Sequence, residues 1–142
     1  MTTKELEQKI YWKLKKLGVY LCFEVGMPRE IKGMKIEERV DLLSYDTNKI
    51  WRFYELKVTK SDFHSKSKVT FLGHYNYYVM PKELYDAVKD EIPKGIGCYV
   101  CSKKFCYCIK KPEKKELGVP EERLKESLIQ ALSRKQDKLF LS

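Results

Sequence analysis

The apolar residues of this chain recur with two different spacings, and these spacings predict an alternation of strands and helices. Short runs rich in β-branched and aromatic residues predict strands, because such side chains pack well on a pleated sheet. Apolar residues three or four positions apart predict helices, because that spacing places them on one face. The predicted strands are residues 19–25, 40–45, 50–58, 75–80, 96–101 and 105–109, and the predicted helices are residues 3–17, a short one from Ser61, 82–92 and one from Pro120 onward.

The order of these elements predicts an α/β fold in which helices flank one mixed β-sheet. The chain begins α, β, β, β, α, β and continues with a helix, a β-hairpin and a terminal helix. Its 142 residues are enough to bury a core, and we expect residues 1–142 to form a single domain. The strands at 40–45 and 50–58 are largely apolar, which predicts central positions in the sheet.

Capping residues predict where two of the helices begin and end. Thr2 and Glu5 have the offset of a capping box, and Gly18 would follow the end of the first helix, whose apolar stripe closes with Leu17. Ser61 is placed to cap the short helix after the second central strand.

Charged residues interrupt the two central strands. A polar turn at residues 46–49 would fold the second strand back beside the first. Because side chains alternate along a strand, Glu55 and Lys57 project from one face, and antiparallel pairing brings Asp41 next to Glu55. Charges on a buried strand are costly unless they are paired or bind a metal ion. Two interpretations follow, namely a structural salt bridge and a metal-binding catalytic site.

The same residues carry a resemblance to a known superfamily. Asp41, followed across a hairpin by Glu55-Leu56-Lys57, resembles the signature of the PD-(D/E)XK nucleases, with Val40 in place of the proline. The runs RVDLLSYD, YELKVTKSDF, HYNYYVMP and IPKGIG are similar to the MmcB-like group of DNA-repair endonucleases and their phage-encoded relatives. The similarity covers about residues 18 to 112. It implies a restriction-endonuclease-like core of the order αβββαβ.

The resemblance also implies a role for each polar residue near the hairpin. Asp41, Glu55 and the carbonyl of Leu56 would hold one Mg²⁺ or Mn²⁺, since these hard ions take oxygen ligands. Lys57 would orient or deprotonate the attacking water, or stabilise negative charge on the phosphate. Glu24 is a candidate further acid, with a surface glutamate on an edge strand as the alternative.

The charge of the chain points to a polyanionic partner. The formal net charge is +9, which favours nucleic acid over a membrane surface, with a solvated surface that binds nothing as the alternative. Lys60, Lys66 and Lys68 lie beside the predicted site and would contact the phosphate backbone. No stretch approaches the roughly 20 apolar residues of a membrane span, so we expect a cytoplasmic protein.

Four cysteines near the end of the chain need a separate interpretation. Cys98, Cys101, Cys106 and Cys108 suggest a zinc ligand set, but a turn at residues 102–104 would place them on the two arms of a hairpin. Their neighbours are apolar, and the spacing of Cys98 and Cys101 makes them face opposite sides of a strand. We expect four reduced, metal-free cysteines, with structural zinc and disulfides as the alternatives.

Together with the resemblance, these observations predict a metal-dependent endonuclease that acts on DNA in preference to RNA. The resemblance implies DNA repair, recombination or phage DNA processing as its setting. Two rival classes stay open. One is a catalytically silent nucleic-acid-binding module, and the other is a phage-type interaction or inhibitor protein with a basic face. The sequence leaves the oligomeric state open, with a homodimer among the alternatives.

Overall fold

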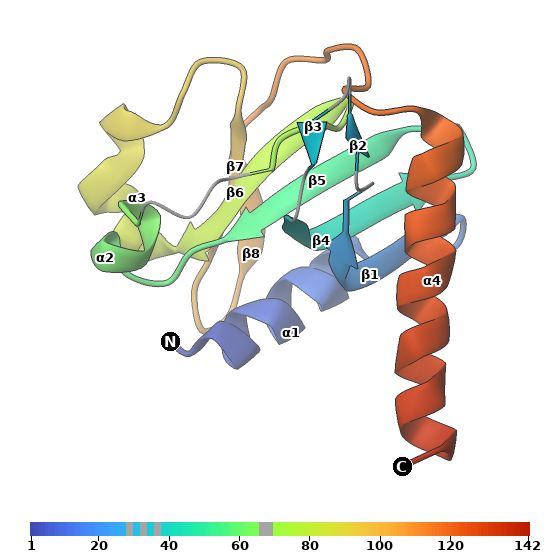
Figure 1. Cartoon of the computed structure of the whole chain (residues 1–142). Coiled ribbons are helices and arrows are strands. Elements are labelled where there is room, and N and C mark those ends of the chain that lie inside the picture. Colours follow the sequence, from blue (N-terminus) through green and yellow to red (C-terminus); the bar gives the residue numbers. More distant parts are fainter. Residues whose placement is uncertain (28–29, 32–33, 36–37, 66–69) are drawn as a thin grey trace.

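A six-stranded mixed sheet runs through the centre of the protein (Figure 1). The structure is a computed structural model, and it describes residues 1–142 except 28–29, 32–33, 36–37 and 66–69. The strands of the large sheet are β1 (Val19–Gly26), β4 (Arg39–Asp46), β5 (Trp51–Leu56), β6 (Tyr75–Pro81), β7 (Gly97–Cys101) and β8 (Cys106–Lys110). Two short strands, β2 (Glu30–Ile31) and β3 (Met34–Lys35), pair with each other outside it.

The strand order β1-β4-β5-β6-β7-β8 combines antiparallel and parallel pairs. β4 is antiparallel to both β1 and β5, β6 is parallel to both β5 and β7, and β8 returns antiparallel to β7. The predicted α/β class with a mixed sheet is therefore confirmed. The predicted central position of the two charged strands is confirmed as well, since β4 and β5 each have a neighbour on both sides.

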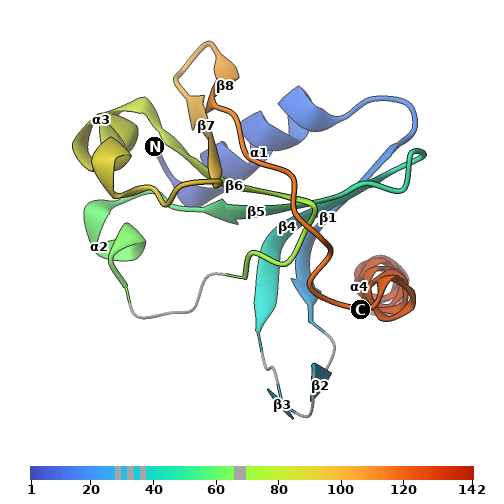
Figure 2. The same ribbon diagram turned by 90° about the horizontal axis from the view of Figure 1, so that it is seen from above.

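Helices cover both faces of the sheet (Figure 2). α1 (Thr3–Leu14) packs on one face, where Leu6 and Ile10 are buried against apolar residues of β1, β4 and β5. α4 (Glu121–Phe140) packs on the opposite face, through Leu124, Leu128 and Ala131. The remaining helices are α2 (Lys60–Phe63), α3 (Lys82–Val88) and the 3₁₀ turn Lys89–Glu91. In the described part of the chain, no helix is both long enough and apolar enough to cross a membrane.

Helix boundaries differ from the predicted ones at three places. The helix predicted at 82–92 ends at Val88 and continues only as the 3₁₀ turn Lys89–Glu91. The Thr2–Glu5 capping box is confirmed, but α1 ends at Leu14 because Lys15 is already extended, and Leu17 is fully exposed instead of packed. Gly18 has φ +83° and serves the turn into β1 rather than the helix end. α2 is capped by the side chain of Thr59, which accepts a hydrogen bond from the Asp62 amide at 3.0 Å, so the prediction of Ser61 as the cap is wrong.

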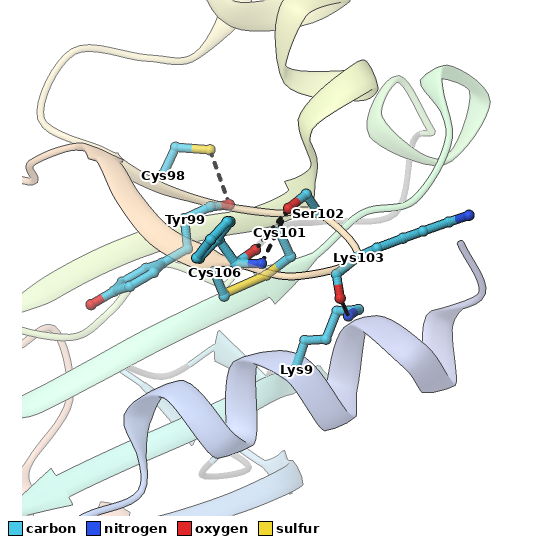
Figure 3. The surroundings of a disulfide bond; sticks show 8 residues. Lys9, Cys98, Tyr99, Cys101, Ser102, Lys103 and Cys106 are labelled. Atoms are coloured by element: carbon cyan, nitrogen blue, oxygen red, sulfur yellow. Dashed lines mark hydrogen bonds between the residues drawn. A yellow bond between two sulfur atoms is a disulfide. The ribbon is translucent and has the colours of Figure 1, made fainter.

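The prediction of four reduced cysteines is wrong for one pair, because Cys101 and Cys106 form a disulfide (Figure 3). The turn between β7 and β8 includes Phe105, one residue more than predicted, so the two cysteines lie directly opposite each other with their Cα atoms 4.1 Å apart. Cross-strand neighbours at this spacing bring their side chains together. Cys98 and Cys108 stay free, and the predicted opposite orientation is confirmed, since Cys98 and Cys101 join clusters on opposite faces.

Candidate active site

A cleft of about 520 Å³ opens where β1 ends, β4 begins and β5 ends, beside the first turns of α1. The structure brings all five residues of the predicted site to its wall, namely Glu24, Asp41, Glu55, Leu56 and Lys57. These residues converge because side chains at the same level of neighbouring strands lie side by side in a sheet.

The register of the strands aligns three carboxylates in one row. Leu42 pairs with Tyr54, which places Asp41 opposite Glu55. On the other side of β4, the pairs around it place Glu24 of β1 opposite Asp41. The Asp41 carboxylate is held in place because its Oδ2 accepts a hydrogen bond from the Leu56 amide at 2.9 Å. Three neighbouring strands thus contribute one acidic residue each at the same level of the sheet.

Glu24 interrupts the regular alternation of β1. Its φ is +54°, a left-handed value that is uncommon for residues other than glycine. Cys22 and Val25 lie three positions apart, yet both pack into the same core cluster, whereas a regular strand would turn them to opposite faces. The irregularity leaves Glu24 exposed at the cleft. Strained backbone of this kind persists where the surrounding structure imposes it and concentrates at functional sites.

Glu55 is the most strongly perturbed acid of the cleft. Its side chain is buried, with 4% of the residue's surface exposed, and its Oε1 accepts a hydrogen bond from the Thr70 amide at 3.2 Å. Burial raises the pKa of Glu55 to about 9, and the charge of Asp41 and a hydrogen bond to it act in the same direction. A carboxylate deprived of water and facing another carboxylate retains its proton. The hydroxyl of Thr70 in turn donates to Glu38 Oε2 at 2.9 Å.

Lys57 lies just beyond the end of β5 and is buried, with 6% of its surface exposed. Its ammonium is 3.9 Å from Asp62 Oδ1, and Asp62 Oδ2 also accepts a hydrogen bond from the Val58 amide at 3.2 Å. Within the described residues, the ion pair of Lys57 is therefore with Asp62 at the start of α2. The alternative of a structural salt bridge between Glu55 and Lys57 does not describe this arrangement.

The cleft is acidic although the chain as a whole is basic. Among the residues that the structure describes, six acidic side chains line it against two cations, in a chain of net charge +9. No three His, Cys, Asp or Glu side chains among the described residues lie close enough together to hold a metal ion by themselves. A pair of adjacent carboxylates, as formed by Asp41 and Glu55, still fits Mg²⁺, which usually keeps several waters and takes only one or two protein carboxylates.

Of the three lysines predicted to bind phosphate, the structure describes one. Lys60 is exposed at the start of α2, and the structure does not bring it into the described lining of the cleft. Lys66 and Lys68 lie outside the described residues.

Among the described residues, five that line the cleft were missed from the sequence, namely Thr3, Glu7, Glu38, Arg39 and Asp62. For Asp62 a signal existed, because Thr59 and Asp62 have the spacing of a capping box, which would have moved the helix start and turned Asp62 toward Lys57. Glu38 and Arg39 stand in a run of charged residues that carries no spacing signal before the strand is known.

Comparisons with known proteins add information on the fold. No protein-family model and no curated protein matches the sequence. A solved structure that is similar is the SPO1766 protein of unknown function from Silicibacter pomeroyi, with a TM-score of 0.75 and 14% sequence identity over 98% of this chain and 92% of that one. At this identity the similarity concerns the fold, which the two chains share over nearly their whole lengths.

Proposed function

We propose that this protein is a metal-dependent nuclease that hydrolyses phosphodiester bonds in DNA. The observation that supports the proposal is the row formed by Glu24, Asp41 and Glu55 on three adjacent strands, with Lys57 beside it in the same cleft. The residues agree in type and order with the nuclease signature that the sequence resembles. A fold alone would not support an activity, so the proposal depends on the site.

Asp41 and Glu55, with the carbonyl of Leu56, would hold Mg²⁺ or Mn²⁺. The donor set suits a hard ion, because the two acids offer oxygen atoms and a cation between them would replace the proton that Glu55 retains without it. When bound, such an ion supplies Lewis-acid activation of water and neutralises charge on the scissile phosphate. Glu24, which lies at the same level of the sheet, would bind the outer waters of that ion.

Lys57 would act on the attacking water or on the phosphate. Its buried ammonium reaches the cleft from the strand that also carries Glu55, and it would orient the water and stabilise the negative charge that develops on phosphorus. Asp62 would position Lys57, because the two charged groups are 3.9 Å apart at the end of the strand. Replacing Asp62 should therefore reduce turnover more than it reduces metal binding.

DNA is the proposed partner, with repair, recombination or phage DNA processing as the setting and the cytoplasm as the compartment. The net charge of +9 supports a polyanionic ligand. Lys60, Lys66 and Lys68 remain the proposed contacts to the phosphate backbone near the cleft. They would position the strand without reading its sequence.

The test is a cleavage assay with purified protein on labelled single-stranded, duplex and branched DNA. Each substrate is incubated with Mg²⁺, with Mn²⁺ and with a chelator. We expect cleavage of at least one substrate that requires the divalent ion and disappears in Asp41→Asn. Glu126→Gln is the matched control, because this exposed acid lies on α4. Retained DNA binding without cleavage under any ion would favour the silent binding module instead.

A further inference from the structure

A second depression, separate in composition from the acidic cleft, lies between α1 and the β7–β8 hairpin. It has a volume of about 830 Å³ and continues into a smaller one of about 420 Å³, with which it shares Lys13, Ser102, Phe105 and Cys106. We refer to the two together as the aromatic groove. Its aromatic side chains are Trp12, Phe105 and Tyr107, and its lysines are Lys9, Lys13, Lys82 and Lys104.

The aromatic side chains of this groove are exposed to an unusual degree. Trp12 is 84% exposed, Phe105 69% and Tyr107 43%. Trp12 projects from α1 on the side away from the buried Leu6 and Ile10, so the core does not need it. Large aromatic rings that cluster on one surface and are exposed to solvent are typical of binding sites.

The groove is positively charged. In the described part of the chain, lysines 9, 13, 82 and 104 line it against one acidic side chain, that of Glu5. Within the described residues, neither Lys13 nor Lys104 has an ion-pair partner. Their charges are therefore available to an anionic ligand.

Hydrogen bonds and a disulfide constrain the shape of the groove (Figure 3). The Lys9 ammonium donates to the Lys103 carbonyl at 2.8 Å and fastens α1 to the tip of the hairpin. The Ser102 amide donates to the Phe105 carbonyl at 2.7 Å, and the Phe105 amide donates to Ser102 Oγ at 3.2 Å. The disulfide between Cys101 and Cys106 closes the hairpin just behind this turn. Phe105 is thus presented on a constrained tip, which reduces the ordering cost of binding.

We infer that the aromatic groove binds single-stranded nucleic acid. Exposed rings beside unpaired lysines are the combination that such ligands require, because bases stack on the rings while the lysines follow the phosphates. A duplex would not satisfy the site, since its bases are stacked on each other. A protein partner is disfavoured, because lysine is depleted from protein interfaces even where aromatic residues are enriched.

The groove and the acidic cleft lie on two sides of the same helix. Thr3 and Glu7 of α1 line the cleft, whereas Lys9, Trp12 and Lys13 line the groove. Glu7 and Trp12 are separated by about 7.5 Å along the helix axis at 1.5 Å per residue. A strand bound in the groove would therefore reach the cleft if it continued around α1. This last step rests on the proposed function, whereas binding in the groove does not.

The test is equilibrium binding of labelled single-stranded DNA, single-stranded RNA and duplex DNA to the full oxidised protein in chelator. We expect tight binding of one or both single strands and weaker binding of the duplex. Trp12→Ala and Phe105→Ala should each weaken single-strand binding by roughly five- to 150-fold, the range for one lost base stack. Phe140→Ala is the matched control, because Phe140 is 74% exposed on α4 and remote from the groove.

Tryptophan fluorescence gives a second readout. Trp12 is exposed whereas Trp51 is fully buried, so stacking of a base should quench the emission of Trp12 alone. Quenching by the oligonucleotide should disappear in Trp12→Ala and persist in Phe140→Ala. Equal affinities of the groove variants and the control, or no quenching on saturation with single strand, would overturn the inference.

The outcomes separate this inference from the proposed nuclease activity. Groove-dependent binding in chelator, from a protein that cleaves nothing with Mg²⁺ or Mn²⁺, would support the groove and refute the nuclease. Metal-dependent cleavage with unaltered binding by the groove variants would support the nuclease and refute the inference about the groove.

Discussion

The acidic cleft and the aromatic groove share helix α1 but differ in every property that selects a ligand. In the described part of the chain the cleft collects six acidic side chains, and its central acid, Glu55, is buried. The groove collects lysines and exposed rings. A polyanion would be attracted to the groove and repelled by the cleft unless a cation had neutralised its acids. The difference indicates that one surface binds the ligand and another carries out the chemistry. Each surface can therefore be tested separately.

The largest expected effect comes from replacing the central acid of the cleft. Glu55→Gln keeps the size of the side chain and its acceptor for the Thr70 amide but removes a proposed metal ligand. Cleavage should fall by more than about a hundredfold, since even residues behind metal ligands typically contribute ten- to a hundredfold. Cleavage rate and Mn²⁺ affinity are the measurements.

The same variant tests whether the two regions are independent. Single-strand binding in chelator should be unchanged in Glu55→Gln, because Glu55 lies in the cleft and not in the groove. A large loss of binding would mean that cleft and groove form one site, and the comparison would fail.

The second effect is a pH dependence of stability in the metal-free protein. The folded pKa of Glu55, about 9, is above its ordinary value of 4.5, so the folded state binds this proton more tightly than the unfolded chain does. The stabilisation is complete below pH 4.5 and is lost as the pH rises toward 9. Between pH 4.5 and 7 the loss is on the order of 3 kcal/mol.

Denaturant unfolding at a series of pH values in chelator measures this loss. Glu55→Gln should flatten the curve, because the neutral amide has no proton to lose. Mn²⁺ should stabilise the wild type more strongly at higher pH, because binding displaces the proton of Glu55. A wild-type curve as flat as that of the variant would show that Glu55 is already ionised and that the cleft holds no strained acid pair.

Much of the fold was predictable from the sequence, because each strand is specified by a short run of neighbouring residues. The runs around Leu42 and Phe53 are apolar enough to require burial on both faces, so their central positions were predictable. Leu17 shows the limit of the same reasoning. It continues the helical spacing of Leu6 and Ile10, yet the helix has already ended, because the chain must turn at Gly18 to enter β1. Only the tertiary course of the chain determines that boundary.

The candidate site was likewise predictable from the sequence only in part. Asp41, Glu55 and Lys57 were predictable because hairpin register and strand alternation are properties of short segments. The pairing of Lys57 with Asp62 depended on where α2 begins, and the bond between Thr70 and Glu38 joins segments 32 residues apart. The aromatic groove was not predicted at all, because Trp12 and Phe105 meet only when α1 packs beside the β7–β8 hairpin.

The third effect concerns the charge of the groove. Lys13→Ala combined with Lys104→Ala should weaken single-strand binding most at low salt, and the slope of log affinity against log salt should decrease by about 0.7 for each lost phosphate contact. The control is the pair Lys135→Ala and Lys138→Ala, which removes the same charge from exposed positions on α4. Equal slopes for the two double variants would mean that only the net charge of the chain matters and that the groove has no special role.

The smallest expected effect is that of opening the disulfide. The Cys101–Cys106 bond closes a loop with a sequence separation of only five, so its stabilisation should be about 2 kcal/mol by the chain-entropy argument. Reduction should leave the fold intact, because Cys101 is also packed among apolar residues, but it should loosen the tip that carries Phe105. Single-strand affinity should then fall a few-fold, while Mn²⁺ binding in the cleft stays unchanged.

Titrations of oligonucleotide and Mn²⁺ with and without reductant measure both quantities. Cys101→Ser combined with Cys106→Ser should reproduce the effect and no longer respond to reductant. An affinity for single strands that is indifferent to reduction would mean that Phe105 is held by the Ser102 hydrogen bonds alone.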